Sequence, residues 1–272
     1  MSAVPASTKR KRDSAPVSPP SEQQALDNDS AEEALQLIAV DGAWATMMIS
    51  SREAGQFIDV TLIIGGRRVP AHKVVLVSAS PFLKGLLTSG LAEFNAQNQE
   101  LTLEDMDGGA VEALVDCMYS GKLRLSSRTV TSVIRVANLL QVGAAEKAAG
   151  EFFLSQLEPS TAADALCFAA DRAACGEHAN ALREGCVKYA VEHFVALSRA
   201  PSFLSLSAET IADLICSDEL RVIGEDSVIG AVRSWIQHDT AGRALSLTVL
   251  MPLIRWPLLS AETRRGLCNE LL

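Results

Sequence analysis

Apolar and polar positions alternate in short stretches of the first half of the chain, and such alternation predicts β-strands. The strongest stretch covers residues 59–64 (DVTLII), which Gly65–Gly66 and then residues 67–69 follow. Two adjacent glycines between β-rich runs predict a hairpin, because glycine readily adopts the positive φ angles of tight turns. Residues 100–103 (ELTL) and 122–125 (KLRL) alternate in the same way, so we expect two further short strands.

Helical periodicity surrounds these strands. The apolar positions of residues 71–87 predict two short helices separated at Ser80–Pro81, since Ser80 is suited to cap a helix and Pro81 to its first turn. Further helices are predicted over residues 31–55, with an interruption at Gly42, and over residues 109–119, 129–140 and 144–157.

Beyond Pro159 the strand patterns stop and helical patterns follow one another to the last residue of the sequence. The predicted helices cover residues 161–174, 179–197, 208–216, 226–238 and 260–272, with Ser260 as the start of the last one. Successive helices of this kind are typical of compact all-α arrays. The pattern therefore predicts a mixed α/β module followed by an all-α module, with the boundary near residues 158–160.

The first 30 residues differ from the rest in composition. They are rich in Ser, Pro and Ala and lack periodic apolar positions, so we expect a disordered tail. Within the tail, Lys9, Arg10, Lys11 and Arg12 form a basic cluster that resembles a short nuclear-import signal. Such a cluster is also common as a solvated run of charge, and the sequence leaves both interpretations open.

Composition and charge narrow the class of protein. The chain of 272 residues is 48% hydrophobic and 21% charged, which is typical of a globular protein. Residues 1–20 carry a net charge of +3, so the remaining residues carry −12 of the total of −9. An acidic body of this kind repels phosphate backbones, and we expect no direct binding of nucleic acid. The sequence has no apolar run of membrane-spanning length and no secretory signal, which predicts a cytoplasmic protein that the basic cluster could direct to the nucleus.

Residues with catalytic or metal-binding potential are scarce. The sequence has no G-x-S-x-G motif. Gly85 and Gly90 have P-loop spacing, but Leu91 and Ala92 stand where that motif needs Lys and then Ser or Thr. The six cysteines include no C-x-x-C pair, and we expect them to be reduced and mostly buried. The four histidines have no partners at metal-ligand spacing, so we expect no metal site. Because the catalytic motifs named above are also missing, we expect no enzyme activity and no cofactor.

A series of motifs occurs in order along the first module. They are Asp59-Val60, Ala71-His72-Lys73, Ser80-Pro81-Phe82-Leu83, Met118-Tyr119-Ser120-Gly121 and Ala137-Asn138-Leu139-Leu140-Gln141. In this order and spacing they resemble the motifs of a BTB/POZ domain. The resemblance implies an α+β BTB/POZ domain over residues 53–157, with the preceding helices of residues 31–52 leading into its dimer face.

The second module carries its own motifs. They are FLSQLEPS (residues 153–160), SLS (205–207), SDEL (217–220), the run from Val228 to Asp239, and IRWPLLS (254–260). They resemble the all-α BACK domain of BTB–BACK–kelch proteins, which would cover residues 158–272. In that family a kelch propeller usually follows, and no residues remain in this sequence for one of its blades. We therefore expect the tail, the BACK surface or a heterodimer partner to bind the substrate.

The resemblance to BTB/POZ domains also implies dimerisation. In the family, the helix ahead of the first strand packs across the partner subunit, and Met47, Met48 and Ile49 lie in that helix here. Self-complementary apolar packing of this kind gives closed homodimers, or heterodimers with other BTB proteins. The alternative is that the segment packs only on its own core.

Many members of the family are substrate adaptors of cullin-3 ubiquitin ligases. They contact the cullin through a hydrophobic residue, any residue and then Glu, a pattern that Leu91 and Glu93 match, with Leu in place of a frequent Met. The resemblance implies that Leu91 fills an apolar pocket and that Glu93 hydrogen-bonds beside it. Tyr119 lies at a position that contacts cullin in some relatives, and a structural role at its turn is an equal alternative.

Asp59 and Lys73 match a charged pair that BTB transcription factors keep in a dimer groove. In those proteins the pair implies binding of a corepressor. A partly buried ion pair that fixes the fold explains the same two residues at least as well.

Two functions are therefore in view. The first is a dimeric substrate adaptor of a cullin-3 RING ubiquitin ligase, which presents an unidentified protein for ubiquitin-dependent degradation. The second is an oligomerisation scaffold, or a transcriptional or competitive regulator, that uses the BTB/POZ domain without any ligase role.

Overall fold

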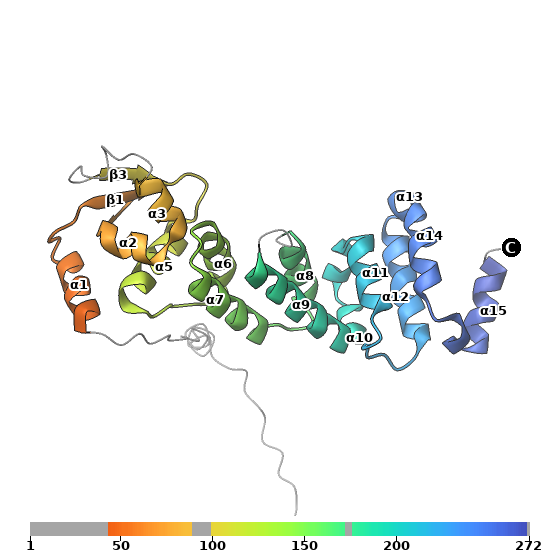
Figure 1. The fold of residues 1–272 in the computed structure, drawn as a ribbon. Coiled ribbons are helices and arrows are strands. Elements are labelled where there is room, and N and C mark those ends of the chain that lie inside the picture. Colours follow the sequence, from red (N-terminus) through yellow and green to blue (C-terminus); the bar gives the residue numbers. More distant parts are fainter. Residues whose placement is uncertain (1–42, 89–98, 172–175, 271–272) are drawn as a thin grey trace, which may run out of the picture. The chain divides into compact units, whose positions relative to one another are not determined.

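A computed structural model describes residues 43–88, 99–171 and 176–270. The predicted tail and its basic cluster, the first part of the helical segment 31–55, and the Leu91 and Glu93 pair lie outside the described residues. Figure 1 gives the order of the elements along the chain.

A three-stranded sheet lies at the start of the described fold. It consists of β1 (Val60–Ile64), β2 (Arg67–Ala71) and β3 (Gln99–Thr102) in the order β2-β1-β3. β1 pairs with β2 in antiparallel register and with β3 in parallel register. Gly65 and Gly66 connect β1 to β2 with φ angles of 53° and 84°, which confirms the predicted hairpin and its need for glycine.

Six described helices accompany this sheet. They are α1 (Ala43–Glu53), α2 (Lys73–Ala79), α3 (Pro81–Thr88), α5 (Gly108–Ser120), α6 (Val130–Leu139) and α7 (Gly143–Ser155). The break between α2 and α3 falls at Ser80, as predicted. Its hydroxyl accepts a hydrogen bond from the Leu83 N–H at 3.0 Å and donates one to the Leu140 carbonyl, so it caps α3 and joins it to the end of α6.

The strand predicted over residues 122–125 is wrong: the structure has no strand there. Leu123 and Leu125 are buried while Lys122 and Arg124 are exposed, so the alternation correctly identifies the inward and outward side chains. A strand also needs a hydrogen-bonded neighbour, and no described segment pairs with this one. Alternation of burial predicts the facing of side chains and not the presence of a pairing partner.

The described elements of the second half are all helices, as predicted. Its elements are α8 (Ala162–Ala170), α9 (Glu177–Glu192), α10 (Phe194–Leu197), η3 (Pro201–Ser205), α11 (Ala208–Cys216), α12 (Glu225–His238), α13 (Thr240–Arg243), η4 (Ala244–Ser246), α14 (Leu247–Leu250), η5 (Met251–Leu253), η6 (Trp256–Leu258) and α15 (Ala261–Glu270). The single helix predicted over residues 179–197 is two, because the backbone leaves the helical region at His193. Short helices between residues 201 and 258 lack the length that gives a periodic pattern, so the sequence did not predict most of them.

One core of buried side chains continues from β1 to α14. Its helices approach closely at α7 and α9, where a Cβ atom on Gly185 would lie 2.5 Å from Cδ1 of Leu154. A larger residue at position 185 would therefore require the Leu154 side chain to move. Because the core is continuous here, the boundary at residues 158–160 stays a prediction from composition.

The described cysteines are free thiols in different environments. Cys186 is buried, Cys117 and Cys167 are half-buried, and Cys216 is exposed, so Cys216 departs from the expectation of mostly buried thiols. Burial raises the pKa of the Cys186 thiol to about 12. No helix in the described ranges is long and apolar enough to cross a membrane.

We expect Cys216 to react with a maleimide at least about tenfold faster than Cys186 in the folded protein, because the reactive thiolate of Cys186 is scarce and shielded. Mass spectrometry of peptides from a timed labelling reaction measures both rates. In denaturant the two rates should converge. Equal rates in the folded protein would contradict the burial of Cys186.

Candidate protein-interaction site

Helix α1 presents apolar side chains to solvent. Trp44 is 55% exposed and Met47 is 70% exposed, and together they form what we call the α1 face. Met48 and Ile49 are half-buried and pack against the core. Of the three predicted dimer residues, the structure therefore leaves Met47 free for a partner and uses the other two mainly within the chain.

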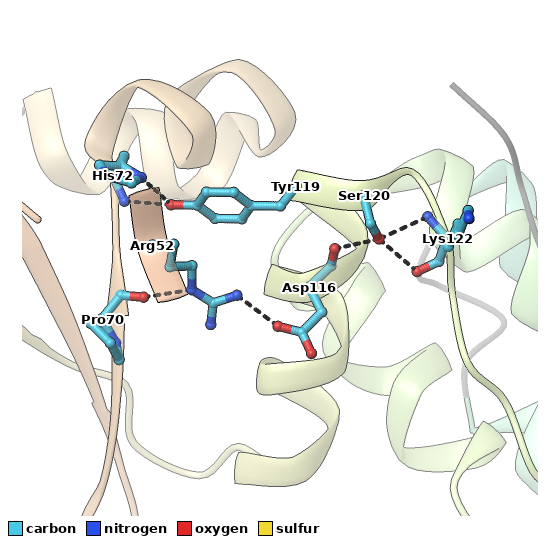
Figure 2. A network of polar contacts seen from close by, with 7 residues as sticks. All are labelled: Arg52, Pro70, His72, Asp116, Tyr119, Ser120 and Lys122. Carbon is cyan, nitrogen blue, oxygen red and sulfur yellow. Dashed lines mark hydrogen bonds and ion pairs between the residues drawn. The ribbon is translucent and has the colours of Figure 1, made fainter. Parts of the chain in front are cut away.

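Arg52 joins the last turn of α1 to the rest of the domain (Figure 2). Its Nε donates to the Pro70 carbonyl at 2.8 Å, and its Nη1 lies 2.6 Å from Oδ1 of Asp116. Its guanidinium also lies 5.0 Å from the centroid of the Tyr119 ring, within the range of a cation–π contact. One side chain of α1 thus contacts both β2 and α5.

Tyr119 and His72 form a buried hydrogen-bonded pair beside Arg52. The Tyr119 hydroxyl accepts a hydrogen bond from the His72 backbone N–H at 2.7 Å and lies 2.8 Å from Nδ1 of His72. Nε2 of His72 lies 2.9 Å from the Gln56 carbonyl, which only accepts, so Nε2 carries the proton and Nδ1 accepts from the tyrosine. Burial raises the pKa of Tyr119, which keeps its hydroxyl protonated for this role.

Two cavities share Tyr119 and Ser120, at the end of α5, in their lining. The larger, of about 640 Å³, is lined by Ile49, Arg52 and Glu53 of α1, Pro70 of β2, Ala113, Asp116, Tyr119 and Ser120 of α5, and Lys122 and Arg124. The smaller, of about 250 Å³, is mainly apolar and is lined by Trp44, Ala45, Ala79, Val142, Ala144, Ala145 and residues 117–121. Residues of α1 line both cavities, so this helix shapes both of them.

The side chains around His72 and the two cavities combine apolar and charged groups. Both ring nitrogens of His72 are used in hydrogen bonds within the chain, and the ring is buried, so it is not presented as an acid or base. Within the described residues, no three His, Cys, Asp or Glu side chains gather in a geometry that could hold a metal ion. Apolar side chains beside charged ones make a surface suited to binding another protein.

Asp59 and Lys73 meet through the backbone. Oδ1 of Asp59 accepts a hydrogen bond from the Lys73 N–H at 2.7 Å, and Lys73 is buried. His72, at the N-terminal end of α2, makes no side-chain capping bond, so Asp59 supplies the acceptor that this helix start needs. This geometry favours the structural interpretation, and binding of a corepressor stays a prediction.

Tyr119 is only 2% exposed, and its hydroxyl is occupied by His72. The structure therefore favours its structural role, and its contact with a cullin stays a prediction. The sequence patterns do not identify Arg52, Asp116 and Trp44 as members of this site. Arg52 and Asp116 are 64 positions apart and carry no local motif, whereas the spacing of Trp44 and Met47 places both on one face of the predicted helix.

Two family models match the chain. The model described as the BTB/POZ domain matches residues 48–157, and the model described as BTB And C-terminal Kelch, or BACK, matches residues 167–267. These ranges agree with the predicted α+β module and the all-α module that follows it.

Curated relatives resemble the same region. Kelch-like protein 17 of Homo sapiens is 32% identical over 219 residues, which are 80% of this chain and 33% of that protein. Kelch-like protein 4 of Homo sapiens is 34% identical over 207 residues, or 76% of this chain and 28% of the relative. The chain thus spans about a third of the length of these relatives.

Among solved structures, the BTB domain of human gigaxonin is 25% identical and covers 43% of this chain and 98% of its own, with a TM-score of 0.36. The family assignment depends on the sequence matches. The two matched domains occupy most of the chain, in the order found in the kelch-like relatives. The chain therefore belongs to the BTB/POZ–BACK proteins, a family of protein-interaction modules.

Proposed function

We propose that this protein is a dimeric substrate adaptor of a cullin-3 RING ubiquitin ligase, which promotes ubiquitin-dependent degradation of a bound protein. The observation that carries the proposal is a BTB/POZ domain followed directly by a BACK domain, with Leu91 and Glu93 between α3 and β3. In proteins of this architecture, the same spacing of a hydrophobic residue and Glu contacts the cullin.

The α1 face supports the dimer. Trp44 and Met47 expose large apolar side chains next to each other on one face of a short helix, and a partner that covered both would remove this apolar area from water. A two-fold axis beside α1 would bring the α1 faces of two copies together. The dimer would then offer two cullin-binding surfaces.

The test is binding of the purified protein to the N-terminal region of cullin-3, measured by isothermal titration calorimetry, together with the oligomeric state. We expect the wild type to bind and Leu91→Asp to bind at least about 100-fold more weakly, since the substitution would bring a charge into the apolar pocket that Leu91 is proposed to fill. Glu93→Ala should weaken binding by about tenfold or more. Both variants should still be dimers.

Matched substitutions elsewhere serve as controls. Leu258 is exposed in η6 and Glu151 is exposed in α7, so Leu258→Asp and Glu151→Ala make the same chemical changes outside the proposed contact. Both controls should bind cullin-3 as the wild type does. A wild-type dimer that shows no binding would refute the adaptor.

A second candidate is an oligomerisation scaffold or competitive regulator that acts through heterodimers with longer kelch-like proteins. The burial of Tyr119 favours it, because one of the three cullin-contact candidates is then used inside the fold. Dimers that pair with such proteins but bind no cullin would identify this function.

As part of this proposal, we place the protein in the cytoplasm and assign nuclear import to Lys9–Arg12. Substitution of these four residues should change the distribution of the protein between cytoplasm and nucleus.

A further inference from the structure

Helix α1 cannot hold its own position by helical propensity alone. It has 11 residues, and isolated helices of this length are marginal in water. Two of its larger apolar side chains, Trp44 and Met47, are 55% and 70% exposed and are not among the buried side chains of the core. The placement of the helix therefore depends on contacts made by its other residues.

The polar contacts are concentrated at one end of the helix. Arg52 donates to the Pro70 carbonyl at 2.8 Å, pairs with Asp116 at 2.6 Å and lies over the Tyr119 ring, and its side chain is only 16% exposed (Figure 2). Just beyond the helix, Nε2 of His72 lies 2.9 Å from the Gln56 carbonyl oxygen and donates a hydrogen bond to it. The C-terminal end is thus fixed, whereas Trp44 and Met47 lie one to two turns before it.

We infer that Arg52 is a positioning residue for dimerisation, which fixes the direction of α1 so that the α1 face meets a second copy without further ordering. The guanidinium is suited to this task because its planar fork satisfies two acceptors at fixed angles, which a lysine ammonium does not do. A helix that is already ordered loses less conformational freedom on association, and that difference appears as affinity. The inference rests on the proposed dimer and names the residue that prepares its interface.

The test compares Arg52→Ala and Arg52→Lys with the wild type by sedimentation over a range of concentrations. We expect Arg52→Ala to raise the dimer dissociation constant at least about tenfold, and Arg52→Lys to lie between it and the wild type because it keeps only the charge. Arg183→Ala is the matched control, since it removes an ion pair of the same 2.6 Å length, with Asp213, that joins α9 to α11. The control should dimerise as the wild type does.

Hydrogen exchange separates positioning from general stability. In Arg52→Ala, the amides of α1 should exchange faster while those of β1 and α5 keep their protection. Loss of protection throughout the domain would overturn the inference, because Arg52 would then stabilise the whole fold.

Met47→Asp separates the proposed dimer face from the positioning role of Arg52. If Met47→Asp prevents dimerisation but Arg52→Ala leaves the affinity unchanged, the positioning role is wrong and the proposed dimer face stands. If Met47→Asp also leaves the dimer intact, α1 is not the interface, and the proposed dimer face fails together with the inference.

Discussion

Replacement of Phe203 by alanine is expected to lower the free energy of unfolding by about 4 kcal/mol. Phe203 lies in η3, is completely buried, and packs edge-to-face against Phe194 at a centroid distance of 6.1 Å. Removal of its ring takes away the buried area and leaves a cavity that the surrounding helices fill only in part. The contact with Phe194 adds to the loss, because aromatic pairs stabilise beyond their buried area.

Urea denaturation measures this loss, and the fluorescence of the buried Trp235 reports unfolding of the same helical region. Phe57→Ala is the matched control. Phe57 is 84% exposed, so the same chemical change should alter the unfolding free energy by less than about 0.5 kcal/mol. If the two variants lost equal stability, Phe203 would not be a core residue.

Phe203 also shows what the sequence could and could not predict about the fold. The succession of helices after residue 159 is confirmed, because helical periodicity is a local property of the chain. The short element that carries Phe203 was missed, since five residues do not complete two turns of a pattern. Its burial comes from contacts with distant helices, and tertiary packing of that kind has no local signal.

Local chemistry explains the successes in the first module. The hairpin at Gly65–Gly66 and the cap at Ser80 each depend on neighbours within a few residues, so the residue types alone predicted them. The predicted strand over residues 122–125 failed for the opposite reason, because pairing depends on a second segment. The motifs of the family, in turn, identified the domain without the geometry of any contact.

In the candidate site, too, features that depend on local sequence could be predicted, and contacts between distant residues could not. The resemblance to BTB/POZ domains predicted Met47, Met48 and Ile49 as dimer residues; Met47 is exposed, whereas Met48 and Ile49 are half-buried. The anchor formed by Arg52 and Asp116 could not be predicted, because any of the many basic and acidic residues could have made that pair. Tyr119 was found by its motif, but only the structure shows that its hydroxyl is bound to His72.

Because of that hydrogen bond, Tyr119→Phe is the second substitution that we expect to change the free energy of unfolding strongly. We expect the variant to unfold with a free energy about 2 kcal/mol lower than the wild type, because a buried His72 N–H loses its acceptor and Nδ1 loses its donor. The phenylalanine ring fills the same space, so no cavity contributes to the change. Urea denaturation near neutral pH gives the difference directly.

Tyr189→Phe is the control, since within the described residues the Tyr189 hydroxyl has no assigned hydrogen-bond partner. This variant should keep the wild-type stability to within about 0.5 kcal/mol. Equal losses in both variants would show that the hydroxyl of Tyr119 contributes nothing through His72.

The pH dependence gives an independent check that the Tyr119 hydroxyl is buried. Burial raises the pKa of Tyr119 in the folded protein, so the unfolded chain ionises first as the pH rises above about 10. The stability that the neutral hydroxyl provides is complete below that pH and is lost as the pH rises through the pKa of the folded state. Phenylalanine does not ionise, and the gap between wild type and Tyr119→Phe should therefore narrow above pH 10. A gap that stayed constant would mean that Tyr119 titrates alike in the folded and unfolded chains, and the Tyr119 hydroxyl would then not be buried in solution.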